Sequence, residues 1–245
     1  MRNIKLVVSY DGTDFHGWQT QPGLRTVQQV LEEAVERLTG ERLRVNASGR
    51  TDTGVHAVGQ VVNFRSATKL TPDVLVRAVN AHLPSDLVVR EAHDMPQAFD
   101  ANRDARRKLY RYVIHDGPVP DVFLRRYACH VKRRLDAAAM RRASRVLVGR
   151  HDFRCFETEW PNRASSVRTV THLALNRMGD WLWLDVEADG FLYNMVRAIA
   201  GTLINVGRGY WPVAQVAEIL EAGDRRLAGP TAPAQGLFLM RVTYE

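Results

Sequence analysis

The sequence predicts an α+β protein made of two halves, each with the element order βαββαβ of a ferredoxin-type split βαβ unit. Three observations predict this class. Short segments alternate apolar and polar residues with a period of two, and longer segments carry apolar residues at helical spacing. The same order of elements then occurs twice along the 245 residues. We therefore expect two domains, over residues 1–105 and 106–245, and the chain is long enough for both to bury a core.

The N-terminal half begins with an alternating strand over residues 4–8. A capping-box pattern at Thr26 and Gln29, followed by an apolar stripe that stops at Gly40, predicts a helix between them. A second helix starts at Thr71-Pro72, because proline is favoured in the first helical turn, and ends before residue 84. Strand patterns occupy residues 43–47, 58–64 and 87–90. These segments complete the order βαββαβ.

The C-terminal half repeats that order. Its predicted strands are 109–114, 170–175, 181–186 and 237–242, and its predicted helices are 135–147, 192–206 and a shorter one over 213–220. No residue-by-residue repeat accompanies the parallel, so it depends on the order of elements alone.

Composition indicates a soluble protein with a polyanionic partner. The net charge is +7, and cations cluster at 103–108, 132–134 and 141–142, where they could contact successive phosphates. No apolar run approaches the roughly 18 residues of a membrane span, and no targeting segment opens the chain, so we expect a cytoplasmic location. Cys129 and Cys155 lack metal-ligand spacing and are interpreted as ordinary thiols.

The most informative stretch is the polar loop over residues 47–57, Ala-Ser-Gly-Arg-Thr-Asp-Thr-Gly-Val-His-Ala. It sets the Asp52 carboxylate near the forked cation of Arg50, between Gly49 and Gly54, whose backbones can adopt conformations closed to other residues. That combination suits chemistry on a nucleotide. An isolated Asp-Thr-Gly is more often an Asx turn, in which the carboxylate only accepts nearby backbone N–H groups.

The longer string resembles the signature of the tRNA pseudouridine synthase A family. Further segments match that family in the same order and together span nearly the whole chain: residues 10–22, 108–112, 149–153, 166–170, 191–203 and 228–237. The resemblance implies two α/β halves that share a mixed, mainly antiparallel sheet flanked by helices, with a basic active-site cleft between the halves.

The resemblance also implies an isomerase. It would convert uridine to pseudouridine at positions 38, 39 and 40, in the anticodon stem-loop of tRNAs. The N1–ribose bond breaks and the sugar rejoins C5, so nothing is gained or lost overall, and we expect no cofactor and no metal. The implied partners are tRNA and a second copy of the chain, with no membrane. Recognition of many tRNAs indicates readout of shape and backbone.

Three residues match the family's active-site positions. Asp52 corresponds to the catalytic carboxylate, acting as a nucleophile or as a base at the ribose. Tyr110 corresponds to a tyrosine that stacks on the detached uracil; the alternative is a core tyrosine on a strand. Arg197 corresponds to a basic residue that pairs with Asp52 and keeps it ionised; the alternative is a helix-surface arginine.

Other residues have weaker assignments. Arg50, Arg168 and His56 are expected to contact substrate, with a structural role as the alternative for His56. The pair at 151–152 is interpreted as structural because no further ligand completes a metal set.

The chain departs from the family after Phe99, where Asp100 and Asn102 replace a His and an Arg. Neighbouring arginines at 103, 106 and 107 are candidates to replace the missing charge. The departure affects details of RNA contact.

Two functions from other classes stay open at this point. One is a catalytically silent RNA-binding module, because ferredoxin-like sheets present aromatic residues to single-stranded RNA. The other is a metal-dependent hydrolase that uses Asp11, Asp52, His56 and His151, although the spacing of these residues is scattered.

Overall fold

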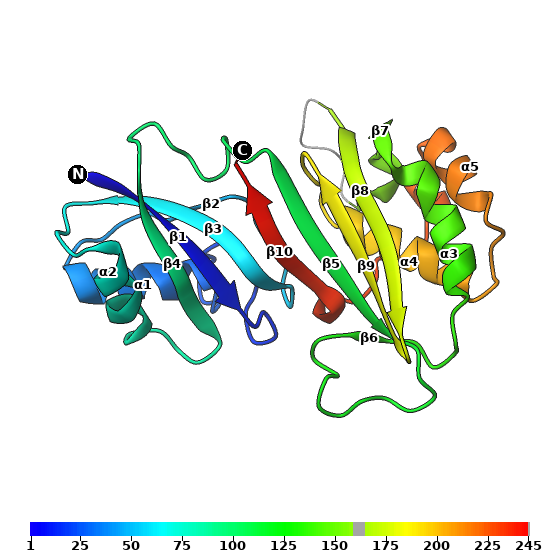
Figure 1. The fold of residues 1–245 in the computed structure, drawn as a ribbon, viewed down its shortest axis with the longest axis horizontal. Helices are drawn as coiled ribbons and strands as arrows, with labels where there is room; N and C mark the ends of the chain where they lie inside the picture. Colours follow the sequence, from blue (N-terminus) through cyan, green and yellow to red (C-terminus); the bar gives the residue numbers. More distant parts are fainter. Residues whose placement is uncertain (159–164, 245) are drawn as a thin grey trace. The chain divides into compact units, whose positions relative to one another are not determined.

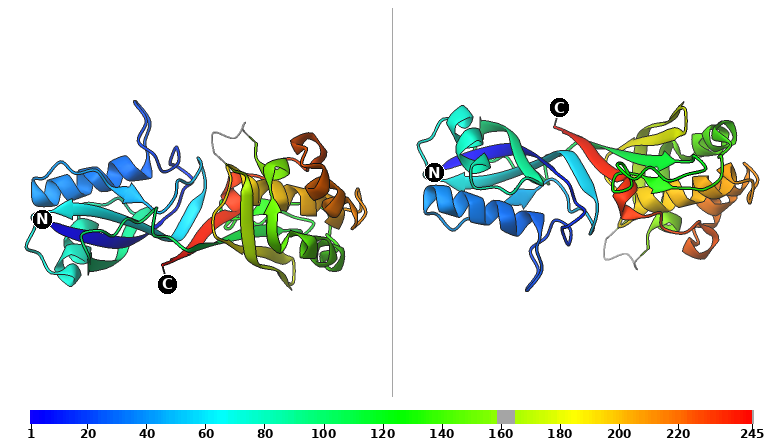
Figure 2. Two further views of the ribbon diagram at one scale, coloured as in Figure 1. Left: turned by 90° about the horizontal axis from the view of Figure 1, so that it is seen from above. Right: turned by 90° about the horizontal axis from the view of Figure 1, so that it is seen from below.

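The computed structural model describes residues 1–158 and 165–244, and the chain divides into two compact units. Unit 1 is Met1–Arg106 with Phe238–Glu245, and unit 2 is Arg107–Leu237. Each unit has its own strands and helices (Figures 1 and 2). The sequence analysis places the division between residues 105 and 106. The last strand differs, because it belongs to unit 1 and not to the second half of the chain.

Unit 1 has two helices and a mixed, mainly antiparallel sheet with the order β4-β1-β3-β10. β1 pairs antiparallel with both β3 and β4, whereas β10 pairs parallel with β3, with Phe238 opposite His56. The α+β class is confirmed. The elements are β1 (Arg2–Tyr10), α1 (Val27–Thr39), β2 (Asn46–Ala47), β3 (His56–Ser66), α2 (Pro72–Asn80), β4 (Leu87–Met95) and β10 (Leu237–Thr243).

The strand predicted over residues 43–47 shrinks to the two residues of β2. The reason lies on α1, whose side chains bind the backbone of Val45. Glu32 Oε1 accepts the Val45 N–H at 2.9 Å, and Gln28 Nε2 donates to the Val45 carbonyl at 3.1 Å. Because these groups are already satisfied, Val45 needs no strand partner.

Both helix starts in unit 1 are confirmed, with different caps. The Thr26 hydroxyl accepts the Gln29 N–H at 3.4 Å, but the Gln29 side chain donates to Glu33, so the reciprocal bond of a capping box is absent there. Thr71 makes no side-chain cap bond, and Pro72 opens α2.

Unit 2 has the strand order β5-β9-β8-β7, all antiparallel, with β6 parallel to the end of β5. α4 packs against β5 and α3, and α3 packs against β8. The elements are β5 (Arg107–His115), β6 (Cys129–His130), α3 (Ala137–Ser144), β7 (Gly149–Asp152), β8 (Val167–Met178), β9 (Trp181–Ala188), α4 (Met195–Gly207) and α5 (Gln215–Ala222).

Several details of unit 2 differ from the sequence expectation; α4, for example, starts at Met195 and not at residue 192. α3 starts at Ala137 and not at residue 135, because the Asp136 carboxylate accepts the Ala139 N–H at 2.9 Å and caps the helix. Its last predicted turn is a 3-10 helix over Arg145–Leu147. The strands β6 and β7 were not predicted, since two and four residues are too short to show a period.

A buried carboxylate joins three elements of unit 2. Asp116, which follows β5, is 2% exposed. It accepts from Arg177 of β8 at 2.6 Å and from the Leu135 N–H before α3 at 2.9 Å, and Arg134 lies 3.3 Å away. Burial opposes ionisation, but these donors outweigh it and hold the pKa of Asp116 below its usual value. The carboxylate therefore ties α3 to the β8–β9 hairpin.

No helix in residues 1–158 or 165–244 is long and apolar enough to cross a membrane.

Candidate functional site

The polar loop that carries Asp52 connects β2 to β3 in unit 1. It packs on the loop that follows β1, so the motifs at 10–22 and 47–57 meet. The Trp18 N–H donates to the Thr51 carbonyl at 3.0 Å, and the Gly54 N–H donates to the Phe15 carbonyl at 3.4 Å. The Val55 N–H closes a turn on the Asp52 carbonyl at 3.1 Å. Backbone bonds on both sides therefore hold Asp52, which is half-buried.

Two glycines of the first loop allow this close approach. A Cβ on Gly12 would lie 2.0 Å from the Val55 carbonyl oxygen, and one on Gly17 would lie 2.7 Å from that of Thr51. Gly17 also has a φ of +78°, in the left-handed region that favours glycine. In the second loop, Gly54 has a φ of 77°, as the sequence suggested, whereas Gly49 is not among the residues with positive φ.

Tyr10, at the end of β1, supports the Asp52 loop through Thr51. Its hydroxyl lies 2.8 Å from the Thr51 hydroxyl, with the rings of Phe15 and Trp18 at 6.4 and 6.3 Å. Burial raises the pKa of Tyr10 to about 12, although the bond to Thr51 partly opposes the shift. Tyr10 is therefore neutral near pH 7 and can donate to Thr51.

Gln60 is a supporting residue that the sequence analysis missed. It is fully buried on β3, where its Oε1 accepts from the Ser48 hydroxyl at 2.6 Å and its Nε2 donates to the Gly49 carbonyl at 2.8 Å. The available signal was a glutamine among the apolar residues of the predicted strand, because a buried amide needs hydrogen-bond partners. Gln60 thus holds the start of the Asp52 loop.

His56 has the surroundings of a structural residue. It is 1% exposed and stacks on Phe238 with ring centroids 4.7 Å apart. Its Nδ1 accepts the Gly12 N–H at 3.0 Å and lies 3.1 Å from the Asp11 carboxylate, which also accepts from Thr13. Of the two roles considered for His56, this environment favours the structural one. Arg50 is exposed, with no ion pair to a described carboxylate.

Tyr110 and Phe191 form an aromatic pair in unit 2. Tyr110 lies on β5 opposite Val186 of β9 and is 8% exposed. Its ring meets Phe191 edge to face, with centroids 5.0 Å apart. The edge-to-face contact fixes the orientation of the tyrosine ring.

Arg197 is half-buried in the first turn of α4. Its Nε donates to the Ala232 carbonyl at 2.8 Å, and its Nη1 donates to Asn194 Oδ1 at 2.7 Å. Asn194 precedes the helix with a φ of 59° and donates to Thr158 at 2.7 Å. The guanidinium is therefore oriented from two sides.

The segment 228–233 lies directly on α4. A Cβ on Gly201 would lie 1.8 Å from the Pro230 carbonyl oxygen, and the Gly229 N–H donates to the Thr202 hydroxyl at 2.9 Å. Arg225 donates to the Gly229 carbonyl at 3.0 Å. The two family-like strings around Gly201 and Pro230 are therefore in contact within unit 2.

Arg168 lies on β8, and its guanidinium binds nearby backbone. Nη1 donates to the carbonyls of Ser165 at 3.1 Å and Val167 at 2.6 Å. A Cβ on Gly190 would lie 3.4 Å from its Nε. Arg168 thus has a structural role in unit 2 in addition to any role in substrate binding.

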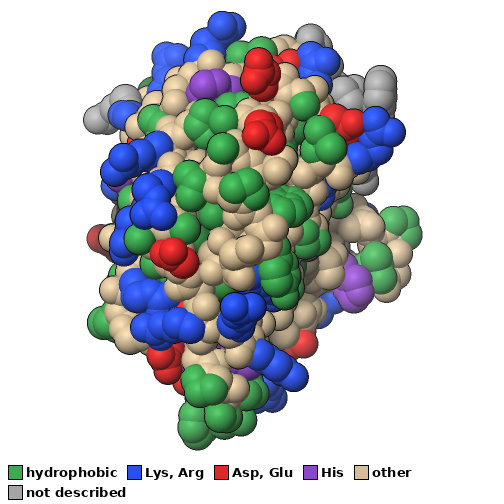
Figure 3. Space-filling model, turned by 90° about the vertical axis from the view of Figure 1, so that its right-hand side faces the viewer, with side chains coloured by type: hydrophobic (Ala, Val, Ile, Leu, Met, Phe, Trp, Pro, Cys, Tyr) green, Lys and Arg blue, Asp and Glu red, His purple; other side chains and the backbone are tan. Residues whose placement is uncertain are grey.

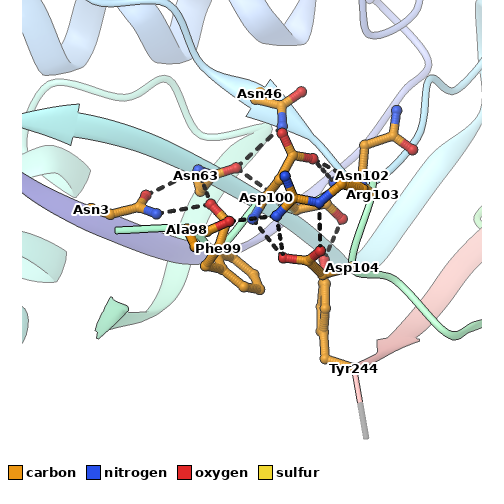
Figure 4. A network of polar contacts seen from close by, with 11 residues as sticks. Asn3, Asn46, Asn63, Ala98, Phe99, Asp100, Asn102, Arg103, Asp104 and Tyr244 are labelled. Atoms are coloured by element: carbon orange, nitrogen blue, oxygen red, sulfur yellow. Dashed lines mark hydrogen bonds and ion pairs between the residues drawn. The ribbon is translucent and has the colours of Figure 1, made fainter. Parts of the chain in front are cut away.

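The turn that departs from the family pattern is a polar network within unit 1 (Figure 4). Asp100 accepts the N–H groups of Asn102 at 2.9 Å and Arg103 at 2.8 Å, and these bonds lower the pKa of Asp100 despite partial burial. The Arg103 guanidinium pairs with Asp104 at 2.8 Å. Asp100 therefore shapes the turn, and the charge of Arg103 is compensated.

Asn63 anchors the same turn from β3. Its Oδ1 accepts the Ala101 N–H at 2.9 Å, and its Nδ2 donates to Asn3 at 3.0 Å. The Tyr244 hydroxyl donates to the Ala101 carbonyl at 2.7 Å. The segment after Phe99 is thus fastened to β3 and to Tyr244, the residue that follows β10.

No group of three His, Cys, Asp or Glu residues in the described ranges could hold a metal ion. His151 hydrogen-bonds the Val148 carbonyl at 3.1 Å. The hydrolase hypothesis therefore lacks its ligand cluster within the part of the chain that the structure describes.

Comparisons with known proteins agree on one family. The family model described as tRNA pseudouridine synthase matches residues 6–102 and 143–245. The chain is 46% identical over 244 residues to tRNA pseudouridine synthase A of Brevibacillus brevis, and 43% identical over 244 residues to that of a Thermoanaerobacter species, with 100% of each chain covered in both cases. It is also 46% identical to the Bacillus licheniformis protein of the same name, over 99% of both chains.

Proposed function

The chain belongs to the tRNA pseudouridine synthase family, and from that membership we propose that it isomerises uridine to pseudouridine in the anticodon stem-loop of tRNAs, at positions 38, 39 and 40. The observation that carries the proposal is the identity of 43 to 46% over the full length of relatives that bear this name. The motif around Asp52 lies within the matched residues.

We propose that Asp52 acts at the ribose. The bond from uracil N1 to the sugar breaks, the sugar is rejoined through C5, the C5 proton leaves to solvent, and N1 gains a proton. The carboxylate either attacks the sugar or removes a proton from it, and both routes need an ionised group held in a fixed place. The anchored loop around Asp52 supports this role.

Tyr110 and Arg197 complete the proposed site. Tyr110 stacks on the detached uracil, and its fixed ring orientation supports that role. Arg197 pairs with the Asp52 carboxylate and favours its charged form, because a neighbouring cation lowers the pKa of a carboxyl group. Arg50 and Arg168 contribute to tRNA binding, whereas His56 holds the loop.

A cytoplasmic homodimer is the proposed state of the protein, by analogy with the family. Light scattering at the working concentration tests the dimer, and a monomeric mass contradicts it. The family chemistry uses no cofactor, and we propose the same for this chain.

The decisive experiment is tritium release from tRNA transcripts that carry uridine labelled at C5, with a chelator present. We expect release by the wild type and a loss of about 10³-fold or more in Asp52→Asn, the upper range for a positioned acid-base group. Asp73→Asn is a matched control, because Asp73 is exposed in the first turn of α2. A transcript with cytidine at positions 38 to 40 should release no tritium.

Two results decide against the proposal. Intact tRNA binding without release from any variant indicates a silent RNA-binding module. Release from the cytidine-substituted transcript contradicts the anticodon-arm target but keeps the reaction.

A further inference from the structure

Helix α3 of unit 2 and the segments next to it carry exposed cations that make no ion pair with the described carboxylates. The proposed reaction does not use them. Four exposed residues surround α3 and are called here the α3 basic face: Lys132, Arg133, Arg142 and Arg145. None of the four has a carboxylate within 4.0 Å among the described residues. Figure 3 shows the side of unit 2 that carries α3 and α5, with Lys and Arg side chains gathered along one edge.

Three other arginines of unit 2 have a structural role, because each makes an ion pair with a carboxylate. Arg177 and Arg134 bind Asp116 at 2.6 and 3.3 Å, and Arg134 also binds Asp180 at 2.6 Å. Arg154 pairs with Asp152 at 2.5 Å. The four residues of the α3 basic face differ from these three arginines, because none of the four makes an ion pair with a described carboxylate.

Stabilisation of α3 by its own dipole explains the positions of only two of these four cations. Arg142 and Arg145 lie at the C-terminal end of α3, where the helix dipole favours cations. Lys132 and Arg133 precede the Asp136 cap, where the same dipole disfavours them. A bound polyanion that runs along α3 favours cations at both ends of the helix, so it accounts for all four residues.

The spacing fits a nucleic-acid backbone. From Asp136 to Arg145 the chain rises about 14 Å at 1.5 Å per helical residue. A duplex carries roughly one phosphate charge per 1.7 Å of its axis, so a backbone of that length offers several phosphates to four cations. Ala138 is exposed between the two charged ends, and its small side chain does not obstruct a backbone that lies along the helix.

The face also lies apart from the proposed uracil-stacking residue within unit 2. α3 packs on β8, two strands from the β5 strand of Tyr110 in the order β5-β9-β8-β7. Lys132 and Arg133 follow β6, which pairs with the far end of β5 at Ile114 and His115, beyond Tyr110 along that strand. From these observations we propose that the α3 basic face binds the phosphate backbone of tRNA away from the reacting uridine. The proposal rests on the proposed function for the identity of the RNA.

The test compares tRNA binding by two variants of equal charge change. The α3 variant carries K132Q, R133Q, R142Q and R145Q. The control variant neutralises exposed cations on and around the helices of unit 1, again three arginines and one lysine: R37Q, R42Q, K69Q and R77Q. The dissociation constant is measured between about 50 and 200 mM salt, and the pseudouridine rate is measured in a single turnover at saturating tRNA.

We expect the α3 variant to bind tRNA about tenfold or more weakly near 100 mM salt, and to lower the slope of log Kd against log salt by about three, since each lost phosphate contact removes about 0.7 to 0.9. The rate at saturating tRNA should stay within about twofold of wild type. The control variant should shift the slope by less than one.

Equal slopes and affinities for the two variants overturn the proposal. The double variant K132Q/R133Q guards against a folding defect, because both residues lie outside α3; it should lower the slope by about 1.5, and an unchanged slope also overturns the proposal. Binding is read independently of catalysis. A wild type that binds tRNA without forming pseudouridine therefore contradicts the proposed function alone.

Discussion

Replacing Gly17 by alanine should slow the reaction without preventing folding, because Gly17 contacts the backbone on either side of Asp52. The new Cβ would lie 2.7 Å from the Thr51 carbonyl oxygen and 3.2 Å from both the Asp52 carbonyl carbon and the Thr53 nitrogen. Ordinary contact begins at 3.4 Å, so the Thr51 carbonyl must move by about 0.7 Å. The Gly17→Ala change also forces alanine into left-handed backbone, at a cost of about 1–2 kcal/mol.

Gly23→Ala separates backbone strain from displacement of the loop. Gly23 lies in the same segment with a φ of +73°, but a Cβ there meets nothing within 4 Å. Gly23→Ala should therefore lose about 1–2 kcal/mol of the free energy of unfolding, measured with urea. Gly17→Ala should lose more, because the backbone around Thr51 must also shift. Only Gly17→Ala also displaces the loop that holds Asp52.

Single-turnover tritium release at saturating tRNA is the assay. A misplacement of about 1 Å at a reacting group can cost 10²-fold in rate, so we expect Gly17→Ala to be slower by about 10- to 100-fold and Gly23→Ala to remain within about threefold of wild type. If the two variants have equal rates, the inference that Gly17 positions Asp52 is wrong.

Two further predictions concern ionisable groups. Asp116→Asn should lower the free energy of unfolding by about 2–3 kcal/mol, because it takes a charged acceptor away from the half-buried Arg177 and from the Leu135 N–H. Asp180→Asn, whose side chain is 52% exposed, should cost about 1 kcal/mol or less in the same urea titration. Since the folded pKa of Asp116 is lowered, its stabilisation is complete above the usual value of 3.8 and is lost as the pH falls below it, so a wild type and an Asp116→Asn variant with parallel stability curves below pH 4 contradict this role. The contribution of Tyr10 to stability has the opposite pH dependence and is lost as the pH rises. The folded pKa of Tyr10 is about 12 against 10.0 when exposed, so between these values the stability of the wild type should fall more steeply than that of Tyr10→Phe, by about 1.4 kcal/mol per pH unit. Equal slopes would refute the assignment.

The elements of unit 1 and unit 2 with long periodic patterns could be predicted from the sequence. The apolar stripe of α1, the Pro72 start of α2 and the alternating strands β1, β3, β5, β8 and β9 all occur where their patterns indicated. Periodicity reports burial on one face, and burial is what those segments share. Periodicity fails for short segments and for segments whose backbone groups bind side chains. The strand predicted around Val45 is an example, because Glu32 and Gln28 of α1 bind the Val45 backbone.

The candidate site divides in the same way. The sequence pointed to Asp52, Tyr110 and Arg197 through a resemblance that the comparisons confirm at the level of the family. Their roles stay predictions. The residues that hold them, such as Gln60 under the Asp52 loop and Asn194 beside Arg197, were not predicted, because each acts through a partner distant in sequence or through an unusual backbone angle.

The sequence by itself determined the fold class, the family and the residues proposed for the chemistry, because periodicity and motif are properties of a string. Only the tertiary structure decided that the last strand joins unit 1 beside His56 and that Gly12 and Gly17 let the Asp52 loop come close. It also decided that the four cations around α3 make no ion pair with the described carboxylates, whereas Arg177 does. These facts depend on which groups meet in space. Contacts between residues far apart in the chain follow from packing, which no local pattern records.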